Sequence, residues 1–138
     1  MFISLARALG ATLYIFVDLI YVIGSKSFYD PAIVALNSGQ PHDVSLVYIG
    51  CAYLSMIIGW LSFAAPKVDE LQSLGWDANS AALIAGFLYS IAVYGVFNFT
   101  LGLMAGPWTL PIILRDLSWC LLWSVGSLRL YLLIKTYF

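Results

Sequence analysis

Three ionisable side chains, Asp18, Arg115 and Asp116, lie inside long apolar stretches of this sequence. A charged side chain at the centre of a bilayer costs about 2.5–3.5 kcal/mol even on the scale derived from insertion experiments. Such side chains are therefore expected to face one another, a cavity or a partner. Carboxylates and a guanidinium in that setting could hold a proton, a cation or a small polar solute.

The two carboxylates are predicted to share one level of the membrane with an amide. At 1.5 Å per residue, Asp18, Asn98 and Asp116 each lie roughly 9–11 Å below the same predicted surface. Tyr94 precedes Asn98 by one helical turn and is expected to face the same way. We call the predicted set the polar layer; it consists of Asp18, Asn98, Thr100, Arg115 and Asp116.

Three interpretations of the polar layer are open. Asp18 or Asp116 could pair with Arg115, while Asn98 and Thr100 tie the helices together by hydrogen bonds. The layer could instead form a pocket for a proton, a cation or a small polar solute, or a pair across to another subunit. Two acids against one base leave one carboxylate without an intramolecular cation, which argues against a purely structural role.

The composition predicts a single-domain integral membrane protein. Of the 138 residues, 62 % are hydrophobic and 9 % are charged, whereas soluble domains hold roughly 45–50 % apolar and about 25 % charged residues. The mean hydropathy of +0.94 agrees. With a net charge of -1 and no cluster of Lys and Arg, the chain has no surface suited to nucleic acid.

We predict an all-α bundle of four transmembrane helices, because a bilayer core about 30 Å thick requires roughly 20 apolar residues per helix. The predicted spans cover residues 3–24, 44–65, 79–104 and 109–137. The first is too long for the apolar region of a signal peptide, about 7–15 residues. A short helix over residues 31–38 lies between the first two spans; it is too short to cross and is expected to lie in the membrane interface.

Helix-boundary residues support these limits. Pro66 is expected to end the second span, since proline cannot continue the hydrogen-bond ladder. Asp77 or Asn79 is expected to cap the third span. Thr109 and Pro111 open the fourth span as a cap followed by a proline in the first turn. The small residues at the start of the third span, Ala81, Ala82, Ala85 and Gly86, predict a close helix–helix approach.

The distribution of basic residues weakly favours one orientation. The side that holds both termini carries Arg7, Lys67, Arg129 and Lys135, against Lys26 and Arg115 on the other side. Both termini are therefore expected on the cytoplasmic, matrix or stromal side. The membrane of an energy-transducing organelle or a bacterial inner membrane would fit.

Metal and cofactor sites are not predicted. One histidine, His42, and two cysteines, Cys51 and Cys120, are too few for a four-ligand zinc site. We interpret the cysteines as packing residues, with Cys51 near the level of the polar layer. The aromatic content of 16 % is compatible with a bound lipid or pigment, although no motif specifies one.

Several of these positions also carry a resemblance. The motif residues are Asp18, Tyr21 and Phe28-Tyr29, then Phe97-Asn98 with Thr100, then Trp108, and finally Asp116 with Trp119. In this pattern the chain resembles a family of small four-helix membrane proteins, domain of unknown function 2177, and looks like a divergent member. The resemblance adds Trp119 to Tyr94 as a residue that supports the layer. It carries no established activity to transfer.

Two positions depart from the pattern of that family. Asn98 stands where the family has Asp, and Leu101 stands where it has Asn. If the family layer performs proton or ion chemistry, this chain lacks one titrating group and one ligand. The resemblance therefore shifts weight from transport towards a structural role.

These observations favour a non-enzymatic accessory or structural subunit of a larger membrane complex, surrounded by lipid and other membrane subunits. The chain lacks a soluble domain, and its loops are short. The alternative is a small transporter or channel that uses Asp18, Asn98 and Asp116. An enzyme is disfavoured, because the sequence shows no nucleophile–base pair and no metal-ligand set.

Overall fold

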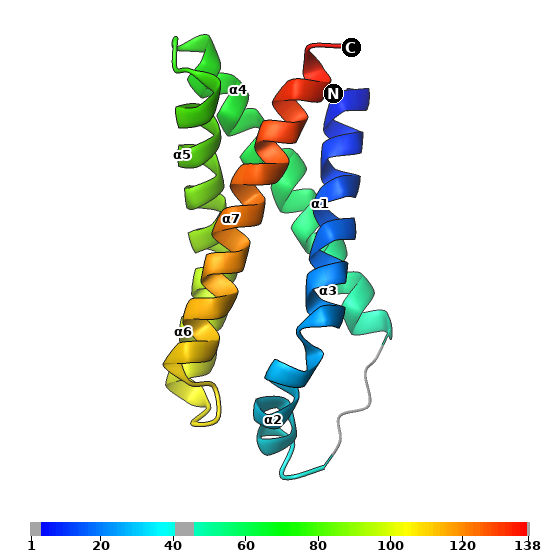
Figure 1. Cartoon of the computed structure of the whole chain (residues 1–138), viewed down its shortest axis with the longest axis vertical. Coiled ribbons are helices and arrows are strands. Elements are labelled where there is room, and N and C mark those ends of the chain that lie inside the picture. Colours follow the sequence, from blue (N-terminus) through cyan, green and yellow to red (C-terminus); the bar gives the residue numbers. More distant parts are fainter. Residues whose placement is uncertain (1–3, 41–45, 138) are drawn as a thin grey trace.

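The computed structural model describes residues 4–40 and 46–137. Figure 1 shows long helical segments packed along one axis, with a short helix at one end. The long segments are α1 (Leu5–Gly24), α3 to α4 (Leu46–Ser73), α5 to α6 (Ala78–Met104) and α7 (Leu110–Lys135). All four are long and apolar enough to cross a membrane, which confirms the predicted all-α bundle with four spans.

The two ends of the bundle differ in content. The described chain starts and finishes at the same end, which we call the terminal end (Figure 1). The short helix α2 and the loop between α6 and α7 lie at the opposite end, which we call the far end. The first two residues of the predicted second span, Val44 and Ser45, lie outside the described residues, as does His42. The choice of membrane and the side that holds the termini stay predictions.

The second span corrects one predicted boundary. Pro66 does not end the helix, which continues as α4 (Ala65–Ser73). A π-helical turn, η1 (Trp60–Ala64), directly precedes α4, and the N–H of Ala65 donates five residues back to the carbonyl of Trp60. In an α-helix the proline ring would clash with a carbonyl of the preceding turn. The wider π turn makes room for that ring.

The third span begins as predicted and then contains a second π turn. Asp77 caps α5 (Ala78–Ser90) by accepting hydrogen bonds from the N–H groups of Asn79 and Ser80, at 2.9 and 3.1 Å. Hydrogen bonds from Ser80 and Asn79 lower the pKa of the Asp77 carboxyl. The cap is therefore an anion at neutral pH beside the positive end of the helix dipole. The turn η2 (Ile91–Gly95) then joins α5 to α6 (Val96–Met104).

The short helix also differs from its predicted limits. α2 covers Lys26–Leu36, so Pro31 lies inside it instead of starting it. The carbonyl of Ser25 accepts the first backbone hydrogen bonds, and contacts of the next residues with the bundle, described below, hold this turn in place. The helix ends at Leu36, two residues before the predicted limit, and Ser38 and Gly39 beyond it adopt left-handed φ angles of 55° and 82°.

Packing is tight at the terminal half and loose at the far half. The small residues predicted to let helices approach, Ala81, Ala82 and Ala85, are 0 % exposed in α5. A Cβ built on Gly86 would lie 2.9 Å from the backbone nitrogen of Val125 in α7. By contrast, α3 (Leu46–Gly59) contains no buried residue. The close approach of α5 and α7 therefore lies in the terminal half.

We predict that Gly86→Val disrupts the α5–α7 contact. The added side chain must push against the backbone of Val125, so the free energy of unfolding should fall by about 1–3 kcal/mol. Thermal unfolding in detergent measures the change. The same substitution at Gly50, whose Cβ would meet nothing within 4 Å, is the control. Equal stability of the two variants would contradict the close approach.

Candidate functional site

A carboxylate and an amide meet between α6 and α7. The Nδ2 of Asn98 donates to Oδ2 of Asp116 and also to the backbone carbonyl of Tyr94, at 3.0 Å. The Nε1 of Trp108 donates to Oδ1 of Asn98 at 2.9 Å. Asn98 is 0 % exposed, so every polar group of its amide is paired inside the bundle. The position is a well-defined hydrogen-bond junction.

The second carboxylate lies on α1. Asp18 is 4 % exposed, and its Oδ1 accepts from Nε1 of Trp119 at 3.0 Å and from the hydroxyl of Tyr94 at 3.2 Å. The hydroxyl of Tyr53 in α3 faces the same carboxyl group. Asp18 is thus surrounded by neutral donors from three other segments of the bundle.

Aromatic side chains join the two carboxylates. Trp119 stacks on Tyr21, with ring centroids 4.1 Å apart and an interplanar angle of 6°. The hydroxyl of Tyr21 lies 2.9 Å from that of Tyr29, which in turn donates to Oδ1 of Asp116 at 3.3 Å. We call the connected set the polar network; it consists of Asp18, Tyr21, Tyr29, Tyr94, Asn98, Trp108, Asp116 and Trp119.

Tyr29 enters this network from α2, outside the spans. Burial raises the pKa of its hydroxyl, and the hydroxyl of Tyr21 and the carboxylate of Asp116 raise it further. Tyr29 therefore stays a neutral phenol that can donate a proton to a hydrogen bond. It ties the short helix to the carboxylate of α7.

Arg115 does not pair with either carboxylate. Its guanidinium donates to Oγ of Ser25 at 3.3 Å and lies 4.1 Å from the ring centroid of Phe28. Within residues 4–40 and 46–137, the ion pairs all involve other acids, namely Asp30, Asp69 and Glu70. Both carboxylates of the network are therefore held by neutral donors alone.

The structure brings some predicted residues together and leaves others out. Asp18, Asn98 and Asp116 converge with Tyr94 and Trp119. Thr100 and Cys51 are exposed, so neither joins the network, and Arg115 points to α2. Sequence reasoning left out Tyr21, Tyr29 and Trp108 as site residues. All three stand at motif positions of the resemblance, and that was the signal that could have found them.

A further carboxylate at the terminal end shows the opposite arrangement. Asp69 accepts from Arg7 at 2.8 Å and from Lys135 and Tyr131 at 2.7 Å each. Two cations and a phenol satisfy this group and tie α1, α4 and α7 together. Asp69 is therefore a structural junction, whereas the polar network keeps its two carboxylates without a cation in the described chain.

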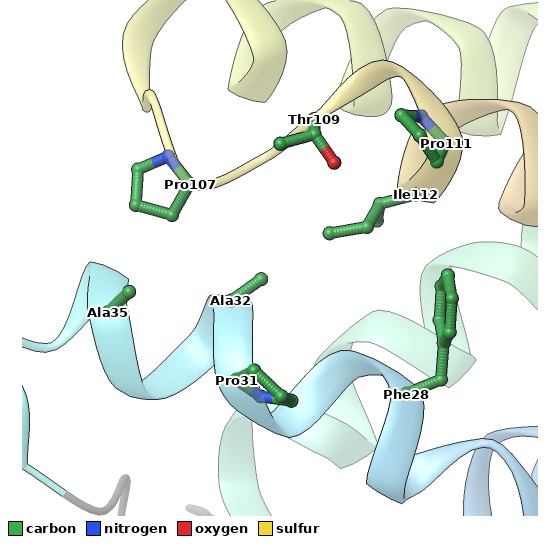
Figure 2. A pocket seen from close by; sticks show the side chains of 8 residues that line it. All are labelled: Phe28, Pro31, Ala32, Ala35, Pro107, Thr109, Pro111 and Ile112. Atoms are coloured by element: carbon green, nitrogen blue, oxygen red, sulfur yellow. The ribbon is translucent and has the colours of Figure 1, made fainter.

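A cavity of about 380 Å³ lies at the far end, between α2 and the start of α7. Figure 2 shows the side chains that line it. Its lining is mostly apolar and consists of Phe28, Pro31, Ala32, Ala35, Pro107, Thr109, Pro111 and Ile112. The contacts of Ser25, Phe28 and Tyr29 therefore hold α2 against the bundle locally, without continuous packing along its length.

One buried hydroxyl lies beside the network without a partner. Tyr14 is 1 % exposed and packs edge-on against Tyr89, at 5.8 Å between ring centroids. Its hydroxyl is the only fully buried side-chain polar atom of the described residues that has no hydrogen-bond partner. The hydroxyl of Tyr94 faces it from η2. The polar character of the network thus reaches one helical turn deeper along α1.

This arrangement can bind a positively charged species. Two carboxyl groups in a low-dielectric interior must each be neutralised by a proton or approached by a cation. The described residues hold no group of three or more His, Cys, Asp and Glu that could share a metal ion. The chemistry open to the network is therefore that of its two carboxyl groups, which can take up a proton or contact a cation.

The comparisons with known proteins agree with this architecture. The family model described as "Predicted membrane protein (DUF2177)" matches residues 3–128. The chain belongs to this family and is an integral membrane protein. No curated protein and no solved structure matches the chain significantly. The matched range includes every residue of the polar network.

We predict that Tyr14→Phe stabilises the protein. Removing a buried hydroxyl that has no partner removes its desolvation penalty, so the free energy of unfolding should rise by about 1 kcal/mol. Tyr89→Phe is the matched control, since its hydroxyl donates to the carbonyl of Met56 at 2.8 Å; it should lose about 0.5–1.5 kcal/mol. Equal losses in thermal unfolding would show that Tyr14 has a partner.

Proposed function

We propose that the chain is a small membrane carrier or channel that binds a proton or a small cation in the polar network. The observation that supports this proposal is that, among residues 4–40 and 46–137, no cation pairs with Asp18 or Asp116, while Arg115 is directed towards α2. The sequence left open that Arg115 pairs with Asp18 or Asp116 in a purely structural role. Among the described ion pairs Arg115 has no such partner, which weakens that interpretation of the polar layer.

The chemistry of the donors points to a cationic species. Indole, phenol and amide groups orient the carboxylates but do not neutralise them. An anion would be repelled by two carboxylates at one level, whereas a proton or cation lowers their cost in the membrane. The π-helical turn η2, which carries Tyr94, is consistent with such a role, because these turns often occur at functional sites.

The different burial of the two carboxylates sets the order in which an entering cation would meet them. Asp116 is half-buried and contacts Tyr29 of α2 at the far end. Asp18 is 4 % exposed and lies deeper, against Trp119 and Tyr94. A cation that enters from the far end therefore meets Asp116 first and Asp18 second. That the chain performs no enzymatic reaction stays part of this proposal.

The proposal predicts loss of flux when either carboxylate is removed. In vesicles containing the purified protein, Asp18→Asn and Asp116→Asn should each reduce flux at least about tenfold, since an interaction with a charged group is worth about 1.5–3 kcal/mol. An internal pH dye under an imposed potential measures protons, and Na⁺ or K⁺ gradients measure cations.

The control makes the same chemical change outside the network. Asp30→Asn alters an exposed carboxylate of α2 that pairs with Lys26 at 2.7 Å, and it should leave flux unchanged. Thermal unfolding verifies that all three variants are folded. Flux that is absent from the parent protein, or equal in the parent and both network variants, rejects the carrier proposal.

A role as an accessory subunit is the second proposal, and a different observation favours it. No residue of α3 is buried, and Leu46, Val47 and Tyr48 are 82 %, 71 % and 78 % exposed. Lipid or another membrane helix must cover this face. A partner would also explain why the far half of the bundle is loosely packed.

The exposed thiol of Cys51 tests this second proposal. A thiol-directed crosslinker with a photoreactive arm, applied in native membranes, should join Cys51 to a specific protein if α3 lies against a partner. The buried thiol of Cys120 should not react, so Cys51→Ser is the control that abolishes the product. Adducts to lipid alone, with a 15.2 kDa monomer after gentle solubilisation, reject the subunit proposal.

A further inference from the structure

A second cavity lies at the terminal end, on the opposite side of the molecule from α2. It measures about 390 Å³ and is lined by Gln72, Ala78, Arg129, Leu132, Leu133, Lys135 and Thr136. Polar and cationic groups of α4 and α7 line it together with two leucines. This mixture differs from the apolar cavity at the far end.

Arg129 is the unusual member of this lining. It is half-buried, and it takes part in none of the ion pairs or side-chain hydrogen bonds formed by residues 4–40 and 46–137. The neighbouring Lys135 is already engaged with Asp69 at 2.7 Å. At 1.5 Å per residue, Arg129 lies about 9 Å inside the end of α7. A guanidinium at that depth requires an anion or water.

We propose that this cavity binds the phosphate group of an anionic membrane lipid. The planar guanidinium of Arg129 can donate two parallel hydrogen bonds to phosphate oxygens, and the amide of Gln72 can supply a third donor. Leu133 is 53 % exposed beside them and offers an apolar surface to an acyl chain. Basic pockets between transmembrane helices are suited to lipid headgroups.

Free phosphate shares this chemistry, but the site favours a lipid. The cavity lies beside the last two turns of α7, and Leu132 and Leu133 form part of its wall. A lipid gains both the phosphate contacts and the burial of its chains, whereas inorganic phosphate gains only the former. This inference is independent of the proposed carrier function, because no residue of the polar network takes part.

Lipid retention tests the proposal on the full-length protein. Protein reconstituted with equal amounts of phosphatidylglycerol and phosphatidylcholine is released into mild detergent, and bound lipids are counted by native mass spectrometry. The parent protein should retain phosphatidylglycerol at least about tenfold over phosphatidylcholine, and Arg129→Gln should lose that preference. Arg129→Lys should lose part of that preference, because lysine keeps the positive charge but lacks the planar guanidinium that donates two parallel hydrogen bonds.

The control variant is Lys67→Gln, which alters a basic residue that already pairs with Glu70 at 3.0 Å. It should retain the lipid preference of the parent. A parent protein without preference, or an Arg129→Gln variant that keeps it, overturns the proposal. Displacement of the lipid by millimolar inorganic phosphate would identify free phosphate as the ligand and would overturn the assignment to a lipid.

Discussion

The structure depends on the high free-energy cost of placing a carboxylate in the interior of a bilayer. Water is absent there, so each acid must find its partners inside the protein. Asp18 and Asp116 find indole, phenol and amide donors from four different segments of the bundle. These bonds set the rotation of α1, α6 and α7 about their axes, because each helix has to turn one polar side chain inwards. The position of α2 follows from the same requirement, through Tyr29.

The carboxylates at the two ends of the bundle have different kinds of partner. At the terminal end Asp69 meets Arg7 and Lys135, and the helices around it are closely packed through small residues. At the far end the carboxylates have no cation among the described residues, and α3 and α6 are largely exposed. The terminal half is therefore closely packed, and the far half, which contains the polar network, has more exposed helices. This division suits a protein whose site must gain and lose a ligand.

Hydropathy and helix caps predict the spans, the Asp77 cap and the common depth of Asp18, Asn98 and Asp116, because these features depend on local sequence and on bilayer thickness. The continuation through Pro66 and the early start of α2 were not predictable in this way. The proline rule assumes α-helical geometry, which η1 relaxes, and α2 starts early because distant residues hold its first turn. The hydrogen bond from Trp108 to Asn98 was not predicted either. An aromatic residue near the end of a span equally suits the membrane interface, so its position alone does not indicate a site residue.

The π turn η2 connects the backbone to the site. The carbonyl of Tyr94 within η2 accepts a hydrogen bond from the amide of Asn98. A widened turn shifts the regular backbone pairing and leaves carbonyls available to side chains. In η2 the same residue then sends its hydroxyl to Asp18 while its carbonyl positions the amide that binds Asp116. Tyr94 thereby links the two carboxylates structurally, to Asp18 through its hydroxyl and to Asp116 through its carbonyl and Asn98.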